Sequence, residues 1–272
     1  MANPTNAPLA GVGVLVTRPR EQADGLCALI EAAGGRAMRL PLLEIVAVDD
    51  STAAAELLSR PDQWDWLIFA STNAVRFALA IHGRPYDPPR RTRIAAIGQA
   101  TAEELIKAGI RVDLIPKPQF NSESLLASPE MADVTDKSIL IVRGEGGREH
   151  LAEVLRSRGA KVAYAEVYRR ILPETDTAHW IDLWRQGRID VVTITSGEAL
   201  TNLTQLLGDA KLEFAERTPL VVIGSRVEKL AREQGWRYVV STEQAGDQAL
   251  AETIIRLIET KRSVRNQQAN QQ

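Results

Sequence analysis

Small, hydroxyl-bearing or basic residues follow short apolar runs at seven places in this 272-residue chain. The apolar runs are typical of buried parallel strands, and each polar group stands just before an expected helix. Backbone N–H groups at the start of a helix are free to bind anions, and an arginine beside them adds positive charge. These loops together predict a polar cleft for an anionic ligand, while each loop alone is more simply explained as an ordinary helix cap. The residues expected to bind the ligand are Thr17, Arg18, Ser71, Thr72, Asn73, Gly98, Thr101, Asn121, Ser122, Arg143, Gly144, Ser196, Gly197, Gly224 and Ser225.

Familiar catalytic motifs do not occur in the sequence. The glycines of residues 144–147 have the wrong spacing for a dinucleotide-binding loop, and no loop ends in the Gly-Lys-Ser/Thr of a P-loop. No G-x-S-x-G nucleophile elbow occurs either. The three histidines are scattered and Cys27 is the only cysteine, so neither a metal cluster nor a disulfide is expected. An activity would therefore depend on hydrogen bonding, charge placement and control of substrate shape, without a metal or cofactor.

Two segments, residues 40–45 and 165–170, occupy equivalent places in the two halves of the chain. Each comes after the first strand–helix–strand part of its half. If the two segments pair, they form a two-stranded connection between two lobes. Tyr168 would then lie at the hinge and face the cleft, although simple packing within the connection explains this tyrosine equally well.

The chain matches itself at an offset of 125 residues. Residues 15–18 align with 140–143, and Asp65 and Ser71 align with Asp190 and Ser196. With one further residue of offset, Ile-Gly at 97–98 aligns with Ile-Gly at 223–224. The order of these matches favours an internal duplication. The alternative is two stretches that share only a generic strand–helix pattern.

The elements that must position the polar loops alternate along the chain. Strands separated by helices indicate an α/β fold with parallel sheets that are covered on both faces. The polar, glutamine-rich tail after Thr260 is expected to be disordered. The expected strands are 12–17, 37–43, 66–70, 94–97, 112–115, 138–142, 190–195, 220–223 and 237–240. The expected helices are 21–33, 74–80, 98–108, 149–158, 227–233 and 248–259.

Composition narrows the class of protein. With 272 residues, 44% hydrophobic and 25% charged, the chain is typical of a globular protein with two domains. A net charge of -2 does not favour a nucleic-acid binder, which would normally be basic. No apolar run approaches the roughly 18 residues that span a bilayer, and the N-terminus lacks the features of a signal peptide. We therefore expect a cytoplasmic protein that binds neither nucleic acid nor membrane.

The motifs together resemble those of the uroporphyrinogen-III synthase family. Each is weak alone, but their order spans roughly residues 12–257 and is specific. The chain departs from some members of the family at residues 225–227, where those members carry threonines. The matching stretches are VLVTRPREQADGLCALIEAAGG, RLPLLEI, DWLIFASTNAVRF, IAAIGQATAEELIKAGI, FNSESLLA, ILIVRGEGGREHLAEVLRSRGAKV and EVYRR, followed by DVVTITSGEAL and VVIGSRVEKLAREQGW.

The resemblance implies two flavodoxin-like parallel-sheet lobes that are related by pseudo-duplication and joined by a two-stranded β ribbon. One lobe is discontinuous, because the first strand and helix belong with the C-terminal part. We expect residues 1–39 plus 172–262 to form the first lobe and 46–163 the second. Residues 40–45 and 164–171 would form the ribbon and 263–272 the disordered tail.

The resemblance also implies an activity. Members of the family cyclise hydroxymethylbilane with loss of water and inversion of ring D, through a spirocyclic intermediate and without metal or cofactor. The substrate carries eight carboxylates, which Arg18, Arg143 and the backbone N–H groups of the loops would bind. Tyr168 matches the family's candidate for assisting departure of the hydroxyl group, and a neutral phenol can donate the hydrogen bond needed. We expect a monomer, and this activity is compatible with transient contact with the preceding pathway enzyme.

Two other functions fit the same residues. A non-enzymatic, two-lobed module that binds an anion or metabolite would have the same loops but no turnover. A phosphate-binding enzyme could use residues 144–148 as an anion loop, and binding of a nucleotide would favour it.

Overall fold

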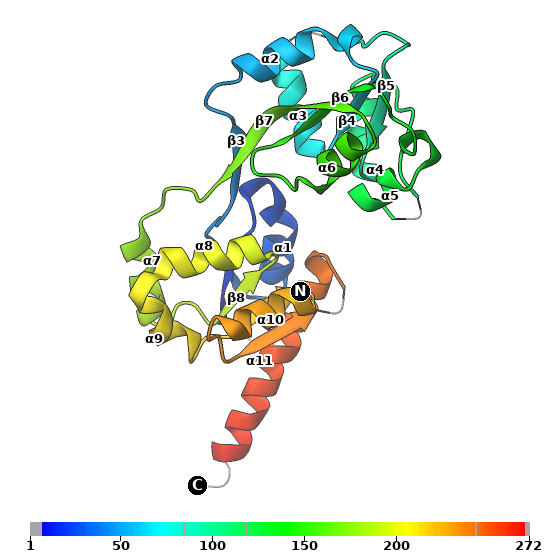
Figure 1. Cartoon of the computed structure of the whole chain (residues 1–272). Coiled ribbons are helices and arrows are strands. Elements are labelled where there is room, and N and C mark those ends of the chain that lie inside the picture. Colours follow the sequence, from blue (N-terminus) through cyan, green and yellow to red (C-terminus); the bar gives the residue numbers. More distant parts are fainter. Residues whose placement is uncertain (1–6, 84, 118, 243, 270–272) are drawn as a thin grey trace. The chain divides into compact units, whose positions relative to one another are not determined.

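The computed structural model describes residues 7–83, 85–117, 119–242 and 244–269. The chain divides into two compact units (Figure 1). The first unit consists of residues 1–44 and 171–272, and the second of residues 45–170. The chain therefore passes between the units twice, and the first unit is built from two separate segments.

The first unit contains a parallel five-stranded sheet in the order β10-β9-β8-β1-β2. Counted along the chain within this unit, the order is that of flavodoxin. The interior strands β1 and β8 are buried along their whole length, as a parallel strand covered on both faces requires. The strands are β1 (Gly13–Val16), β2 (Arg36–Arg39), β8 (Val191–Ile194), β9 (Leu220–Ile223) and β10 (Val239–Thr242).

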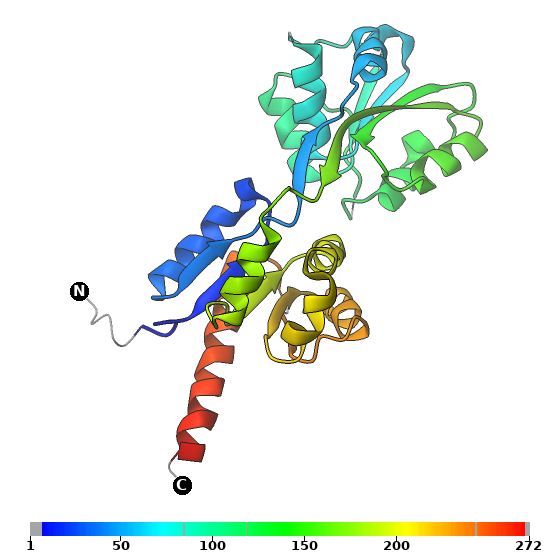
Figure 2. The same ribbon diagram turned by 90° about the vertical axis from the view of Figure 1, so that its left-hand side faces the viewer.

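Helices cover both faces of this sheet (Figure 2). One face packs against α1 (Arg20–Ala32) and α11 (Asp247–Ala269), through residues such as Leu26 and Ile254. The opposite face packs against the remaining helices, through residues such as Leu203 and Trp184. These helices are α7 (Thr177–Arg185), α8 (Gly197–Leu207), α9 (Lys211–Ala215) and α10 (Ser225–Glu233), with a 3₁₀ turn at Gly208–Ala210.

Helix α11 continues through Ala269, so the expectation of a disordered tail from residue 263 is wrong for residues 263–269. Leu250, Ile254 and Ile258 anchor the helix in the core. Beyond them, lysine, arginine and glutamine have good helix propensity, so the helix extends past its packed part. The guanidinium of Arg262 also donates hydrogen bonds to carbonyls near the start of the chain. Residues 270–272 lie outside the described residues.

The second unit contains a five-stranded sheet in the order β3-β7-β6-β4-β5, in which β4 to β7 are parallel. The strand expected at 112–115 is reduced to a single bridge between Leu114 and Ala95. It does not extend because Pro116, two residues after Leu114, has no N–H to donate to the next carbonyl of β5. The strands are β3 (Glu44–Ala47), β4 (Trp66–Phe69), β5 (Arg93–Ala96), β6 (Ser138–Gly144) and β7 (Lys161–Ile171).

Helices also cover both faces of the second sheet, and the structure confirms the expected α/β class with two parallel sheets. One face packs against α2 (Thr52–Ser59), α3 (Thr72–His82) and α4 (Gln99–Lys107). The other packs against α5 (Ser122–Leu126) and α6 (His150–Ser157). Short 3₁₀ turns occur at Pro61–Gln63 and Pro129–Met131.

The strand registers of the two sheets follow the spacing found in the sequence. Val16 pairs with Thr193 in the first sheet. The residues that correspond to these two at the 125-residue offset are Ile141 and Ile68, and they pair with each other in the second sheet. At an offset of 126, the pair Val240 and Val221 corresponds to the bridge between Leu114 and Ala95. The two sheets therefore share a pairing scheme, while their origin by duplication stays a prediction.

The expected ribbon needs a correction. Strand β7 runs without interruption from Lys161 to Ile171 and pairs with β6 as far as Tyr168. Residues 164–168 therefore belong to the sheet of the second unit. The neighbouring strand β3 lies at the edge of that sheet, whereas Leu40 and Leu42 pack in the core of the first unit.

We expect residues 172–262, made alone, to unfold without a cooperative transition. Strand β1 lies between β8 and β2, so this fragment lacks one of the three interior strands, the edge strand β2 and the α1 side of one core. Residues 45–170 should melt cooperatively, and the shorter fragment 46–163 should melt at a lower temperature because it lacks Ala165 and Val167. Thermal denaturation followed by circular dichroism measures this. A sharp transition for 172–262 would contradict the expectation.

Candidate functional site

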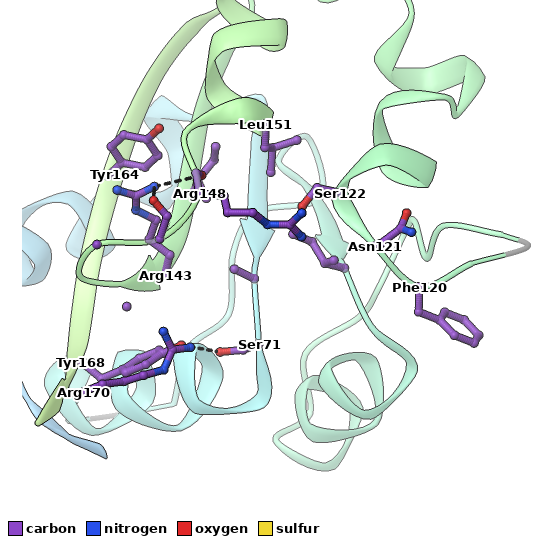
Figure 3. Close-up of a pocket in the computed structure, with 16 residues that line it drawn as sticks. Ser71, Phe120, Asn121, Ser122, Arg143, Arg148, Leu151, Tyr164, Tyr168 and Arg170 are labelled. Carbon is purple, nitrogen blue, oxygen red and sulfur yellow. Dashed lines mark hydrogen bonds between the residues drawn. The ribbon is translucent and has the colours of Figure 1, made fainter. Parts of the chain in front are cut away.

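A cavity of about 390 Å³ opens at the carboxyl ends of β6 and β4 in the second unit (Figure 3). From β6 the chain passes to β7 on one side, and from β4 to β5 on the other. The cavity therefore lies at the topological switch point of the sheet, where open α/β folds bind their ligands. Six of the residues expected from the sequence line it, namely Ser71, Asn121, Ser122, Arg143, Gly144 and Tyr168.

An irregularity in β7 directs Tyr168 into the wall of this pocket. Arg143 on β6 pairs with Glu166, but the next residue, Gly144, pairs with Tyr168, so β7 has one additional residue at this point. Such a bulge changes the face to which the following side chains point. Tyr168 accordingly packs in the same core cluster as Val167.

The ring of Tyr168 is held on several sides and is only 3% exposed. Its centre lies 5.8 Å from that of Phe77, and its backbone carbonyl accepts a hydrogen bond from Glu145 N–H at 2.8 Å. The phenol oxygen lies 3.1 Å from Ser71 Oγ, which also accepts a hydrogen bond from Ala74 N–H at the start of α3. The hydroxyl group of Tyr168 is therefore fixed at the pocket wall by a serine that caps a helix.

Gly144 makes room for this ring. A Cβ atom at this position would stand 2.4 Å from Cε2 of Tyr168, far inside van der Waals contact. Any other residue would displace the tyrosine, because Phe77 packs against the same ring. The function of Gly144 here is thus steric.

Arg143 lies beneath the loop of residues 144–149 with all five of its N–H groups engaged. Nε and Nη2 donate to Glu166 Oε1 at 3.2 and 2.9 Å, and Nη2 also donates to Glu149 Oε1 at 2.7 Å. Nη1 donates to the carbonyls of Gly147 and Arg148 at 3.2 and 3.3 Å. The guanidinium also stacks on Tyr164, at 3.7 Å from the ring centre. Arg143 therefore organises the loop and has no N–H left for a ligand.

Arg143, Glu149 and Tyr164 shift one another's pKa values through their hydrogen bonds and charges. The Tyr164 hydroxyl donates to Glu149 Oε2 at 2.6 Å, and this bond, together with that from Arg143, holds the pKa of Glu149 below its usual value. Burial and the same carboxylate raise the pKa of Tyr164. Burial opposes the charge of Arg143, but its hydrogen bonds to Glu149 and Glu166 leave its pKa raised. Since the pKa of Glu149 is lowered by folding, its contribution to stability persists at neutral pH and is lost only as the pH falls through that lowered value.

We expect Arg143→Lys to lower the free energy of unfolding by about 2 kcal/mol, because an ammonium cannot replace the five directed hydrogen bonds of the guanidinium. Urea denaturation measures this change. Arg148→Lys is the matched control, since Arg148 pairs with Glu123 in solvent and such pairs contribute about 0–1 kcal/mol. Equal stability of the two variants would show that Arg143 does not hold the loop.

The other expected residues lie outside this pocket. In the second unit, Thr72 and Asn73 form the first turn of α3, Gly98 precedes α4, and Thr101 is buried on α4. The remainder belong to the first unit, and their contribution to binding stays a prediction. They are Thr17, Arg18, Ser196, Gly197, Gly224 and Ser225.

Arg18, which is equivalent to Arg143 in the repeat, is also engaged within its own unit. It forms an ion pair with Asp247 at the start of α11. Gly25 leaves space for that carboxylate, because a Cβ there would stand 2.3 Å from Asp247 Oδ2. Thr17 is fully buried and donates to the carbonyl of Thr193 at 2.6 Å. Both side chains therefore have structural partners.

Sequence reasoning missed several residues that line the pocket. On β7, Tyr164 and Arg170 lie in the pocket with Tyr168. Arg170 follows Tyr168 by two residues, a spacing that places strand side chains on one face and could have identified it. Tyr164 precedes the bulge and packs on the opposite face of the sheet, so the alternation gave no signal for it. Phe120 and Leu151 carried no comparable signal. The further lining residues are Ala70, Ile97, Ile141, Gly146, Gly147 and Arg148.

Among the described residues, no three or more His, Cys, Asp or Glu side chains are grouped so that they could hold a metal ion. In the same part of the chain, no helix has the length and apolar character required to cross a membrane.

Comparison with known proteins gives a consistent result. A family model described as uroporphyrinogen-III synthase HemD matches residues 24–252. The chain is 33% identical over 241 residues to the uroporphyrinogen-III synthase of Escherichia coli, and the match covers 88% of this chain and 98% of that protein. It is 34% identical over 243 residues to the enzyme of Salmonella typhimurium, with the same two shares.

Solved structures of low sequence identity share the fold. A mutant uroporphyrinogen III synthase from Thermus thermophilus has a TM-score of 0.60 at 19% identity, and the match covers 94% of this chain and 99% of that one. The Helicobacter pylori structure has a TM-score of 0.57 at 17% identity, with shares of 90% and 99%. The family model and the bacterial relatives, matched over most of the chain, show that it belongs to the uroporphyrinogen-III synthase family.

Proposed function

We propose that this protein converts hydroxymethylbilane to uroporphyrinogen III, with loss of water and inversion of ring D. As a member of its family, it is a lyase of porphyrin biosynthesis. The observation that carries the proposal is the phenol of Tyr168, fixed 3.1 Å from Ser71 in the wall of a pocket that also contains arginines. This arrangement supplies a hydroxyl donor beside groups that attract a polycarboxylate.

In the proposed reaction the C–O bond of the hydroxymethyl group breaks as the pyrrole nitrogen donates electron density. The departing oxygen gains negative charge and takes the proton of Tyr168, so that water leaves. Ring D attacks the resulting cation through the carbon that already carries the methylene bridge to ring C, which gives the spirocyclic intermediate. That bridge bond then breaks and re-forms at the free α carbon of ring D, which loses its proton as aromaticity is restored. That proton balances the one given by the phenol, so the cycle needs no net acid.

The pocket contributes by position as well as by proton transfer. Ser71 Oγ keeps the phenol oxygen at a fixed place, and the network around Arg143 holds the loop of residues 144–149 in one conformation. A preorganised donor avoids the cost of reorienting groups at the moment of reaction. The contribution of one such donor is typically about 10²–10⁴-fold in rate.

The activity is tested by coupling the purified protein to a source of hydroxymethylbilane and separating uroporphyrinogen isomers I and III. Isomer III should form only in its presence, since the unassisted substrate closes without inversion to isomer I. Binding of the bilane without formation of isomer III would instead support the non-enzymatic binding module.

We also propose that the protein acts in the cytoplasm as a monomer, without nucleic acid or membrane, and receives its substrate from the preceding enzyme of the pathway. Light scattering during size-exclusion chromatography tests the monomer. A stable dimer would contradict it.

A further inference from the structure

Three arginines line the pocket of the second unit, namely Arg143, Arg148 and Arg170. A ligand carboxylate can use only a guanidinium whose N–H groups are not already bound. The partners of the three arginines differ, and they identify the one that remains available.

Two of the three are paired. Arg143 is about nine-tenths buried and donates all five N–H groups to protein acceptors. Arg148 is exposed, but its Nη1 lies 3.0 Å from Glu123 Oε1, so its charge is partly compensated. Neither arginine presents a complete, uncompensated guanidinium to the pocket.

Arg170 differs from both. It is exposed, and within the described part of the chain no carboxylate lies at ion-pair distance and no acceptor receives a hydrogen bond from it. It follows Tyr168 by two residues on β7, and its guanidinium carbon lies 5.7 Å from the centre of the Tyr168 ring. Figure 3 shows the two side chains together on the wall that also holds Ser71.

We propose that Arg170 binds a carboxylate of the substrate's acetate or propionate side chains and thereby places that pyrrole ring beside Tyr168. The proposal rests on the proposed function and adds a specificity-determining residue to it. A planar guanidinium binds a carboxylate through two parallel hydrogen bonds, which fixes orientation as well as distance. The aromatic face beneath it restricts the guanidinium before the ligand arrives.

Arg170→Gln should raise KM by about tenfold or more and change kcat little, because the carboxylate does not react and its contact is the same in the ground and transition states. Arg170→Lys, which keeps the charge but loses the paired hydrogen bonds, should give an intermediate KM. The KM of Arg170→Gln should also depend less steeply on ionic strength than that of the wild type.

Arg169→Gln is the matched control. It removes the same charge from the adjacent position, but Arg169 does not line the pocket and instead pairs with Asp49 at 2.6 Å. We expect its KM to equal that of the wild type. Melting temperatures of all variants show that the fold is retained.

An unchanged KM for Arg170→Gln, or a fall in kcat alone, would overturn the proposal. If the wild type forms no isomer III, the proposed function fails, and a direct binding measurement decides the present proposal separately. The probe is uroporphyrin III, a stable octacarboxylate whose fluorescence anisotropy reports binding. Weaker binding to Arg170→Gln than to Arg169→Gln supports the proposal, whereas equal affinity, or no binding to the wild type, refutes it.

Discussion

Tyr168→Phe is expected to lower kcat by at least about tenfold, some 1.4 kcal/mol in activation free energy, without a change in melting temperature. The substitution keeps the ring that packs against Phe77 and removes only the phenol oxygen. Ser71 Oγ still accepts the hydrogen bond from Ala74 N–H, so no buried polar group loses its last partner. Steady-state kinetics and thermal denaturation measure the two quantities.

The product distribution gives a second result for the same variant. Unconsumed hydroxymethylbilane closes without inversion, so isomer I should accumulate at the expense of isomer III. Tyr238→Phe is a suitable control, because Tyr238 is 55% exposed in the first unit and does not line the pocket. The competing hypothesis is that the substrate ionises unaided and the protein only shapes it. Formation of isomer III by Tyr168→Phe at the wild-type rate would favour that hypothesis.

The strands of the sheets could be predicted largely from the sequence, because each strand is marked by a short run of neighbouring residues. Strands β1 and β8 are short apolar runs, and burial on both faces leaves few other uses for such runs. The offset of 125 residues between Val16 and Ile141 also relates the strand registers of the two sheets, because residues that pair in one sheet correspond to residues that pair in the other. What failed depended on single residues, as where Pro116 lacks the N–H that would continue the pairing beyond the bridge between Leu114 and Ala95.

The pocket could be predicted only in part, because the partners of its charged groups come from distant positions. Arg18 and Arg143 were expected to bind the ligand, yet Asp247 is 229 residues from Arg18 and Glu166 is 23 residues from Arg143. A sequence shows that an arginine follows a strand, but it does not show whether a carboxylate of the folded protein already forms an ion pair with that arginine. The bulge opposite Gly144 is likewise invisible in the pattern, although it decides where Tyr168 points.

Gly144→Ala, which adds only one carbon atom, is expected to lower both the stability of the second unit and kcat. The new Cβ would stand 2.4 Å from Cε2 and 2.5 Å from Cζ of Tyr168, so the ring must move. Overpacking of this kind costs about 1–3 kcal/mol of unfolding free energy. Since the phenol leaves its place beside Ser71, kcat should fall at least as far as in Tyr168→Phe. Urea denaturation and the isomer assay measure both effects.

Gly147→Ala controls for the loss of a glycine from the same loop. Its Cβ would meet Arg143 Cδ at 3.4 Å, an ordinary contact, so stability and kcat should change little. The steric origin can be tested further in a Tyr168→Ala background, where the obstructing ring is gone. There, Gly144→Ala should cost far less unfolding free energy than in the wild type, and this non-additivity measures the contact directly. If Gly144→Ala costs the same in both backgrounds, the close approach of Gly144 and Tyr168 does not determine the position of the phenol.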